Sequence, residues 1–105
     1  MQKRCEVQFA DSAEQDLDAV IAWYDMQLVP EVGRRLVAAV VEHVEQLQIF
    51  PESGTVTPEF ANPLLRELHL PPFRIVYRIE RVDLVSIVRV WRSERLMDPA
   101  LGGNA

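Results

Sequence analysis

The chain has 105 residues, of which 11 are Lys or Arg and 16 are Asp or Glu, so its formal net charge is −5. This length suits one domain with its own hydrophobic core and is too short for two. A hydrophobic fraction of 49% and a charged fraction of 26% are typical of a globular protein and exclude a disordered or collagen-like chain. The negative net charge argues against a protein whose whole surface binds nucleic acid.

The charge is distributed unevenly along the chain. Residues 1–63 carry four basic and eleven acidic side chains, a net charge of −7, whereas residues 64–105 carry seven basic and five acidic ones, a net charge of +2. Ten of the eleven basic residues are arginines. The planar guanidinium suits phosphate or carboxylate recognition, although arginine also serves as a long, well-packed surface residue. Any basic working surface is therefore expected in the C-terminal part.

Several classes of site and of localisation signal find no support in the sequence. Cys5 is the only cysteine, which excludes an intramolecular disulfide, and two histidines are too few for a typical structural zinc site. The longest apolar stretch, Leu36–Val41, is far shorter than the roughly 20 residues that cross a bilayer, and no signal-peptide core follows the N-terminus. Motifs for phosphate-binding loops and common hydrolases are missing. We expect a cytoplasmic protein with no membrane contact, no metal and no cofactor.

The N-terminal half predicts one strand followed by two helices. Apolar and polar residues alternate over Cys5–Phe9, as in a half-buried strand. Asp11 and Ser12 then predict a helix cap, with Asp11 and Glu14 at the spacing of a capping box. Apolar residues recur at helical spacing from residue 13 to 28 and again from residue 32 to about residue 50, with Pro30 at the break. So short a break predicts an antiparallel helical hairpin.

The C-terminal half predicts strands. A turn at Pro51–Gly54 and a loop to Pro63 precede three candidate strands, at residues 64–70, 73–79 and 84–91. Their short connections favour an antiparallel meander. The expected fold class is therefore α+β, with two layers in which the helical hairpin packs on one face of a four-stranded antiparallel sheet. We expect a single domain over residues 1–97 and a flexible tail over residues 98–105.

The order and spacing of several short motifs resemble those of one known family. The motifs are Val7–Phe9, Ala13–Leu17, Ala22–Tyr24, Leu47–Gly54, Leu65–Leu68, Phe73–Arg78 and Ile87–Trp91. Together they resemble the RelE/ParE superfamily of bacterial toxins, often called plasmid stabilisation proteins. The resemblance implies the RelE/ParE-like fold and a growth-inhibiting toxin, neutralised by a cognate antitoxin protein in a hetero-oligomer.

The superfamily has two mechanisms, and one of them is enzymatic. RelE-like members cut messenger RNA on the ribosome by attack of a ribose 2′-hydroxyl on the adjacent phosphate. This chemistry needs a base, an acid and cations that stabilise the developing charge. Arg74 matches the position of a catalytic arginine in the family, and Arg92 and Arg95 follow the last strand. The segment after that strand lacks the histidine and tyrosine that these enzymes use there, and the chain is not strongly basic.

ParE-like members bind DNA gyrase and lack the nuclease residues, and their C-terminal strand is implicated in the effect. The stretch Arg89–Arg95 resembles their ending but has Arg92 where a histidine is frequent. Our first hypothesis is therefore a non-catalytic, ParE-like gyrase inhibitor. Its expected target-binding residues are Arg74, Arg89, Trp91, Arg92 and Arg95. The alternatives are an mRNA-cutting enzyme that uses Arg74 with Arg92 or Arg95, and a non-toxic relic that only binds an antitoxin.

Individual side chains allow both functional and structural interpretations. Arg74 and Arg78 share one face of a strand, which is either a target-binding surface or simply solvated. For Arg66 both an ion pair with a neighbouring carboxylate and contact with a ligand are open, and for Trp23 we expect packing in the core. His69 is the only histidine near the arginines and thus the candidate proton carrier. For Trp91, both packing and target binding remain open.

Overall fold

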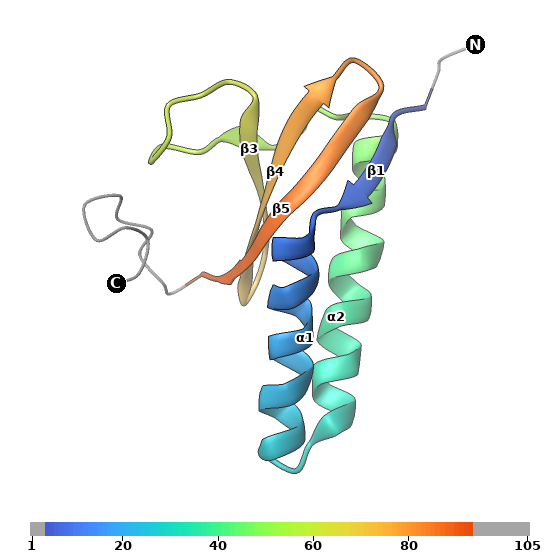
Figure 1. Cartoon of the computed structure of the whole chain (residues 1–105), viewed down its shortest axis with the longest axis vertical. Coiled ribbons are helices and arrows are strands. Elements are labelled where there is room, and N and C mark those ends of the chain that lie inside the picture. Colours follow the sequence, from blue (N-terminus) through green and yellow to red (C-terminus); the bar gives the residue numbers. More distant parts are fainter. Residues whose placement is uncertain (1–3, 94–105) are drawn as a thin grey trace.

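The computed structural model describes residues 4–93, which form a helical hairpin and a five-stranded sheet (Figure 1). The N-terminal elements are β1 (Glu6–Phe9), α1 (Asp11–Met26), α2 (Pro30–His43) and the 3-10 helix η1 (Val44–Gln48). The remaining strands are β2 (Thr55–Val56), β3 (Leu65–Leu70), β4 (Phe73–Arg81) and β5 (Leu84–Arg92). These elements confirm the α+β class. The expected tail at residues 98–105 lies outside the described residues.

The sheet differs from the expected four-stranded antiparallel one in two respects. Its strand order is β1-β5-β4-β3-β2, and β1 pairs with β5 in parallel, with Val7 opposite Val85. A parallel pair needs a long connection between its strands, and here most of the chain separates β1 from β5. The fifth strand, β2, comes from the segment expected to be a loop and pairs with Arg66 and Glu67 of β3. The other neighbouring strands are antiparallel as predicted, and a cis Pro71–Pro72 peptide lies between β3 and β4.

The helix caps show a second difference. Asp11 is already the first residue of α1, and Ala10, which precedes it, makes no side-chain cap. The predicted capping box is therefore wrong. Ser12 instead donates its hydroxyl to the carbonyl of Val88 at 2.6 Å, because β1 pairs with β5 only as far as Ile87 and leaves Val88 without a strand partner on that side. Pro30 lies in the first turn of α2, as predicted.

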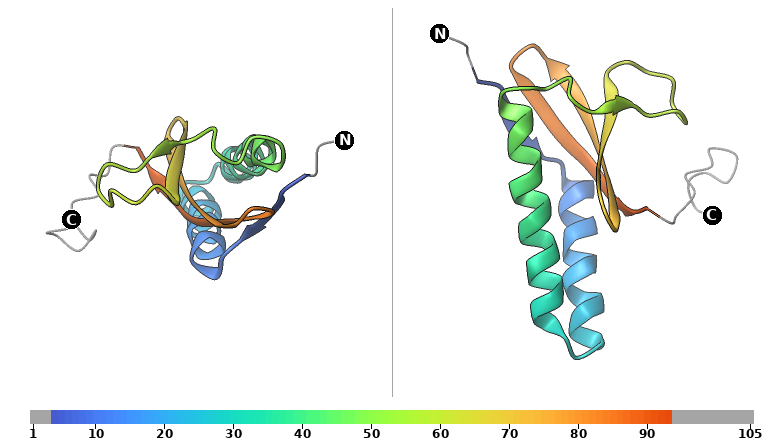
Figure 2. Two further views of the ribbon diagram at one scale, coloured as in Figure 1. Left: turned by 90° about the horizontal axis from the view of Figure 1, so that it is seen from above. Right: turned by 180° about the vertical axis from the view of Figure 1, so that it is seen from behind.

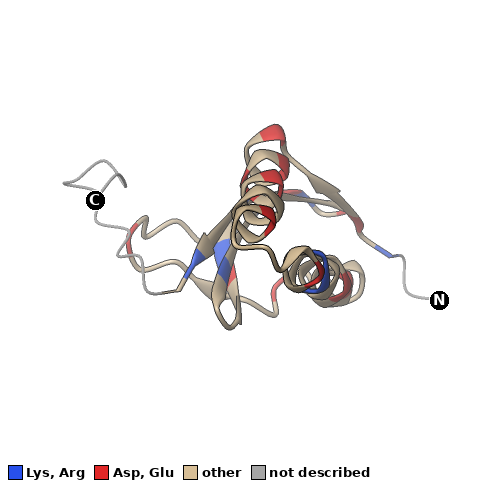
Figure 3. Cartoon of the chain, turned by 90° about the horizontal axis from the view of Figure 1, so that it is seen from below, with Lys and Arg blue, Asp and Glu red and all other residues tan. Residues whose placement is uncertain are grey.

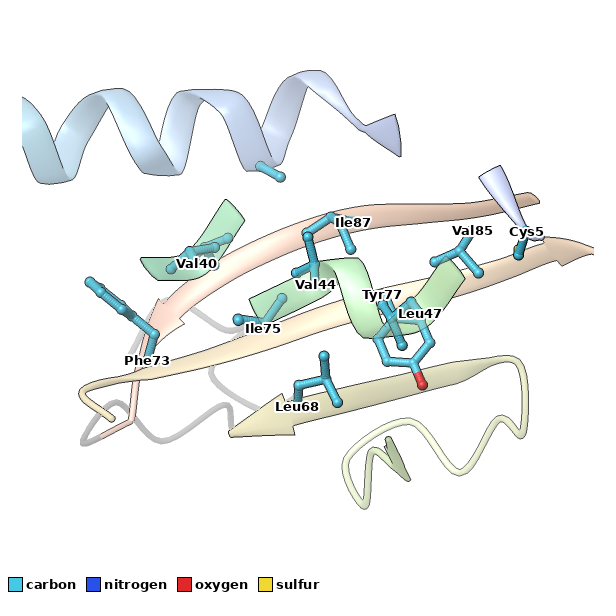
Figure 4. Packing of buried hydrophobic residues seen from close by; sticks show 12 residues of the cluster. Cys5, Val40, Val44, Leu47, Leu68, Phe73, Ile75, Tyr77, Val85 and Ile87 are labelled. Atoms are coloured by element: carbon cyan, nitrogen blue, oxygen red, sulfur yellow. The ribbon is translucent and has the colours of Figure 1, made fainter. Parts of the chain in front are cut away.

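One core joins the helices to one face of the sheet (Figure 4). Alternate residues of β4 and β5 meet the apolar faces of α2 and η1, since side chains along a strand point to opposite faces. The buried members of the core are Cys5, Ala13, Val40, Val44, Leu47, Leu68, Phe73, Ile75, Tyr77, Val85, Ile87 and Val90. Cys5 is thus an ordinary buried side chain, and burial raises the pKa of its thiol.

The helical hairpin extends well beyond the end of the sheet, so its far half has no sheet to cover (Figures 1 and 2). The expectation that Trp23 packs in the core is wrong: the residue is 53% exposed. Within the described residues, no helix combines the length and the apolar character needed to span a membrane.

A buried hydroxyl holds the turn that follows η1. Tyr77 donates its hydroxyl to the carbonyl of Pro51 at 2.8 Å and accepts the N–H of Gly54 at 2.9 Å. Replacing Tyr77 with Phe leaves both backbone groups without this partner in a buried site. We expect Tyr77→Phe to lower the free energy of unfolding by about 1–3 kcal/mol, measured by urea denaturation. An unchanged value would show that other contacts hold the turn.

Candidate functional site

The residues predicted to bind the target fall into two groups on neighbouring strands. Arg74 lies on β4, on the face of the sheet away from Phe73 and Ile75, which enter the core. Arg89 and Trp91 lie near the end of β5, together with Arg92. Arg95 lies outside the described residues. The two groups differ in how far their side chains are already engaged within the protein.

Arg74 is the centre of a four-residue polar network with Glu59, Glu67 and His69. Its Nε donates to Oε1 of Glu67 at 3.0 Å, and its Nη2 contacts the same oxygen. Its Nη1 and Nη2 donate to the two carboxylate oxygens of Glu59 at 3.0 and 3.1 Å. The second oxygen of Glu67 lies 2.9 Å from Nε2 of His69. The Nε and both terminal nitrogens of the guanidinium therefore contact carboxylates of the chain itself.

The network buries Arg74, which is only 8% exposed although an accessible position was expected. The segment between β2 and β3, which carries Glu59, contributes the second carboxylate. Hydrogen bonds from Arg74 hold the pKa of Glu59 below its usual value. Burial by itself lowers the pKa of Arg74, but its hydrogen bonds with Glu59 and Glu67 outweigh burial and raise it. The guanidinium of Arg74 is thus enclosed by carboxyl groups from two separate segments of the chain.

Sequence reasoning missed both glutamates of this network. Glu67 carried a signal, because the alternation along β3 puts it on the same face as His69, which lies opposite Arg74 in the register. Glu59 carried none, since it comes from an irregular segment. Of the two interpretations of Arg66, the ion pair is wrong within residues 4–93: this side chain donates there to the backbone carbonyls of Pro63, Glu52 and Gly54 and not to a carboxylate.

The second group borders a groove between α1 and the ends of β4 and β5, with a volume of about 480 Å³. Its lining residues are Asp16, Ala19, Val20, Trp23, Tyr24, Phe73, Arg89, Val90, Trp91 and Arg92. Both tryptophans of the chain are among them, one from α1 and one from β5. Three of the five residues expected to bind the target therefore line one concave surface.

Asp16 of α1 lines this groove and binds the end of β5. Its two oxygens accept hydrogen bonds from Nε and Nη2 of Arg89 at 2.8 and 2.9 Å, and one of them also accepts the backbone N–H of Val90 at 2.8 Å. This hydrogen bonding with Asp16 raises the pKa of Arg89. The guanidinium carbon of Arg89 then lies 4.5 Å from the centre of the Trp91 ring, in cation–π contact. Asp16 was not predicted. The sequence indicates it through its position on α1 next to Leu17, which packs against the core.

The groove is suited to binding more than to chemistry. Its aromatic walls offer apolar contact, and the two arginines and one aspartate among its described lining residues leave an excess of one positive charge. Among the described residues, neither a histidine nor a cysteine lines it. Within residues 4–93, no three side chains among His, Cys, Asp and Glu are grouped closely enough to hold a metal ion.

Comparisons with known proteins relate the chain to toxin–antitoxin systems. The model of a family described as the ParE toxin of the type II toxin–antitoxin system parDE matches residues 7–97. A solved chain from the chromosomal ParDE system of P. aeruginosa is 29% identical, with a TM-score of 0.72, over 87% of this chain and 98% of that one. A chain of the toxin–antitoxin complex RelBE2 from Mycobacterium tuberculosis has a TM-score of 0.62 over 90% of this chain and 98% of that one; at 22% identity it shows the fold alone. No curated protein gives a match.

The Glu59–Arg74 pair predicts a defined pH dependence of stability. Because the pKa of Glu59 is lowered by folding, its ion pair stabilises the fold above the ordinary glutamate pKa of about 4.3, and this contribution is lost as the pH falls through the lower folded value. We expect the stability difference between wild type and Glu59→Gln to be constant near neutral pH and to shrink below about pH 4.3. Urea denaturation at several pH values measures it. Glu80→Gln, at an exposed position of β4, is the control and should show no such difference.

Removing Asp16 should loosen the junction of α1 and β5. Asp16→Ala deletes three hydrogen bonds, but Arg89 is 40% exposed, so water compensates part of the loss. We expect a decrease of about 1–3 kcal/mol in the free energy of unfolding. Asp18→Ala, at an exposed position on the same helix, should stay within about 0.5 kcal/mol of wild type. Equal effects of the two substitutions would contradict the role given to Asp16.

Proposed function

The chain belongs to the ParE toxin family of type II toxin–antitoxin systems, and we propose that it inhibits bacterial growth by binding DNA gyrase and is neutralised by a cognate antitoxin. The single observation that carries the choice of target is the contrast between the two arginine groups. Arg74 is buried and held by two carboxylates, whereas Arg89, Trp91 and Arg92 line an open groove. The proposed target also places its action in the cytoplasm.

The state of Arg74 weighs against the nuclease alternative. A catalytic arginine must direct its donors at the phosphate in the transition state. Here the fork of Arg74 contacts Glu59, and a phosphate could reach it only after the carboxylate had left. The neighbouring Glu67 would still repel the charge that develops on the phosphate. The network therefore supports a structural role for Arg74 in this chain.

The groove has the features of a protein-binding surface. Tryptophan and arginine are enriched among the residues that dominate interface energies, and both types are concentrated here. Trp23 and Tyr24 form an edge-to-face pair with ring centres 4.8 Å apart, which fixes one wall. Arg92 lies at the exposed end of β5. We assign contact with gyrase to this surface, with Arg89, Trp91 and Arg92 as its main residues.

An antitoxin partner is supported by the solved relatives, whose names describe toxin–antitoxin systems or complexes. The strand order leaves β1 and β2 at the two edges of the sheet. Unpaired strand edges accept an additional strand from a partner protein, and an apolar groove accepts a helix. We propose that the antitoxin uses such contacts to form a hetero-oligomer with this chain.

The target is tested with purified bacterial DNA gyrase in a supercoiling assay. The wild-type protein should inhibit supercoiling, and Arg92→Ala should raise the half-inhibiting concentration about tenfold through loss of an interface arginine. Arg81→Ala is the matched control, because Arg81 is an exposed arginine that pairs with Asp83 outside the groove. It should inhibit as the wild type does.

Other results would select one of the alternatives. Cleavage of messenger RNA within codons after induction, abolished by Arg74→Ala, would establish the ribosome-dependent enzyme and contradict the gyrase proposal. Normal growth after induction without the antitoxin gene, with no inhibition of gyrase, would indicate the non-toxic relic.

A further inference from the structure

Three side chains of the groove contact one another in a fixed order, Asp16, Arg89 and Trp91. Nε and Nη2 of Arg89 donate to the two oxygens of Asp16 at 2.8 and 2.9 Å, and the guanidinium carbon lies 4.5 Å from the centre of the Trp91 ring. Two hydrogen bonds to one carboxylate fix the plane of a guanidinium as well as its position. Asp16 therefore determines how the face of Arg89 lies against the ring of Trp91.

A bulge in β5 brings Arg89 and Trp91 together. The register between β4 and β5 skips Val88, and a bulge of this kind re-aims the side chains that follow it. Ile87 and Val90 consequently both enter the core, although they are three positions apart. Arg89 and Trp91, two positions apart on the strand, then share the opposite face. Regular alternation would instead have directed Arg89 to the same side as Ile87.

The two residues differ in what they offer a partner. The positive charge of Arg89 is offset by Asp16, whose own side chain is only 14% exposed. Trp91 is half-buried and lines the groove. Tryptophan is prominent among the residues that dominate interface energies, and a ring that is already fixed loses less rotamer freedom when a partner binds. Trp91 is therefore suited to direct contact, and Arg89 to its support.

We propose that Trp91 makes the contact with gyrase, and that Asp16 and Arg89 are positioning residues that act through the orientation of its ring. This rests on the proposed function and assigns separate tasks to residues of the same groove. The contribution of Arg89 to inhibition then comes from its planar group, which holds the ring, and not from its charge.

Asp16→Asn distinguishes positioning from charge, because the two roles of Arg89 predict opposite effects. The substitution removes the carboxylate that offsets the charge of Arg89, so a charge contact with gyrase would become stronger. It also weakens the hydrogen bonds that fix the guanidinium, so a positioning role predicts weaker inhibition. We expect the half-inhibiting concentration in the supercoiling assay to rise about two- to tenfold, the cost of ordering one side chain on binding.

Asp18→Asn is the matched control. α1 carries several Asp and Glu residues and no Lys or Arg (Figure 3), so this substitution changes the charge of the same helix by the same amount. Asp18 is exposed and is not among the described lining residues of the groove. Asp18→Asn should inhibit gyrase as the wild type does.

Arg89→Lys tests the same role without changing the charge. Lysine keeps the positive charge but lacks the planar group that stacks on the ring and binds a carboxylate through two nitrogens. Arg89→Lys should therefore weaken inhibition as Asp16→Asn does. In a Trp91→Ala background neither substitution should weaken inhibition further, because both act through the ring.

The mobility of the ring can be measured without gyrase. With Trp23 replaced by Phe, Trp91 is the one remaining tryptophan, and the decay of its fluorescence anisotropy reports how freely the ring moves. Asp16→Asn and Arg89→Lys should speed this decay at a temperature where thermal unfolding curves show each variant to be folded. Asp18→Asn should leave it unchanged.

The outcomes separate the positioning role from the proposed function. If the wild-type protein does not inhibit gyrase, the proposed function and the contact of Trp91 are both wrong. If it does, and Asp16→Asn or Arg89→Lys inhibits equally well or better, the positioning role alone is wrong. It is also wrong if Asp18→Asn weakens inhibition as much as Asp16→Asn, or if these substitutions act equally with and without the Trp91 ring.

Discussion

Strand β5 extends beyond its neighbour β1, and this difference in length determines where the groove forms. β1 pairs with β5 only from Leu84 to Ile87, whereas β5 continues to Arg92. Backbone groups beyond Ile87 need other partners, since unpaired polar groups are costly once they leave water. α1 supplies two of them, the hydroxyl of Ser12 and the carboxylate of Asp16. These bonds hold α1 beside the end of β5, and the groove lies between the two elements.

Arginines of one chain can serve opposite purposes according to the carboxylates around them. Arg74 is enclosed by Glu59 and Glu67 and ties an irregular segment to the sheet. Within the described part of the chain, Arg89 contacts a single carboxylate, Asp16, which leaves its planar face on Trp91 at the groove. The buried ion pairs of Arg74 add positional order more than stability, since desolvation offsets much of their attraction. The basic character of the C-terminal half is therefore only partly available to a partner, and it is concentrated at the end of β5.

Periodic elements could be predicted from the sequence, whereas contacts between distant segments could not. Helical and strand spacing located α1, α2, β3, β4 and β5, because one buried face imposes its period on the residues. The parallel pairing of β1 and the two-residue strand β2 depend on contacts between remote segments, which no local pattern encodes. Arg89, Trp91 and Arg92 were predicted as target-binding residues through a family resemblance, whereas Asp16, which positions Arg89, had no motif. Trp23 was misjudged because the helical period does not reveal where the sheet ends.

The hairpin turn shows the same limit in another form, since the local preference for glycine is not followed there. Pro30 at the start of α2 and the hydrogen bonds of the turn are what the fold requires. Leu28 is not, for its backbone favours glycine and its side chain meets water. Natural sequences agree with their fold at most positions, and the exceptions concentrate at functional sites. The conformation of Leu28 could therefore not be predicted from the sequence, because the local rule expects glycine at a left-handed position.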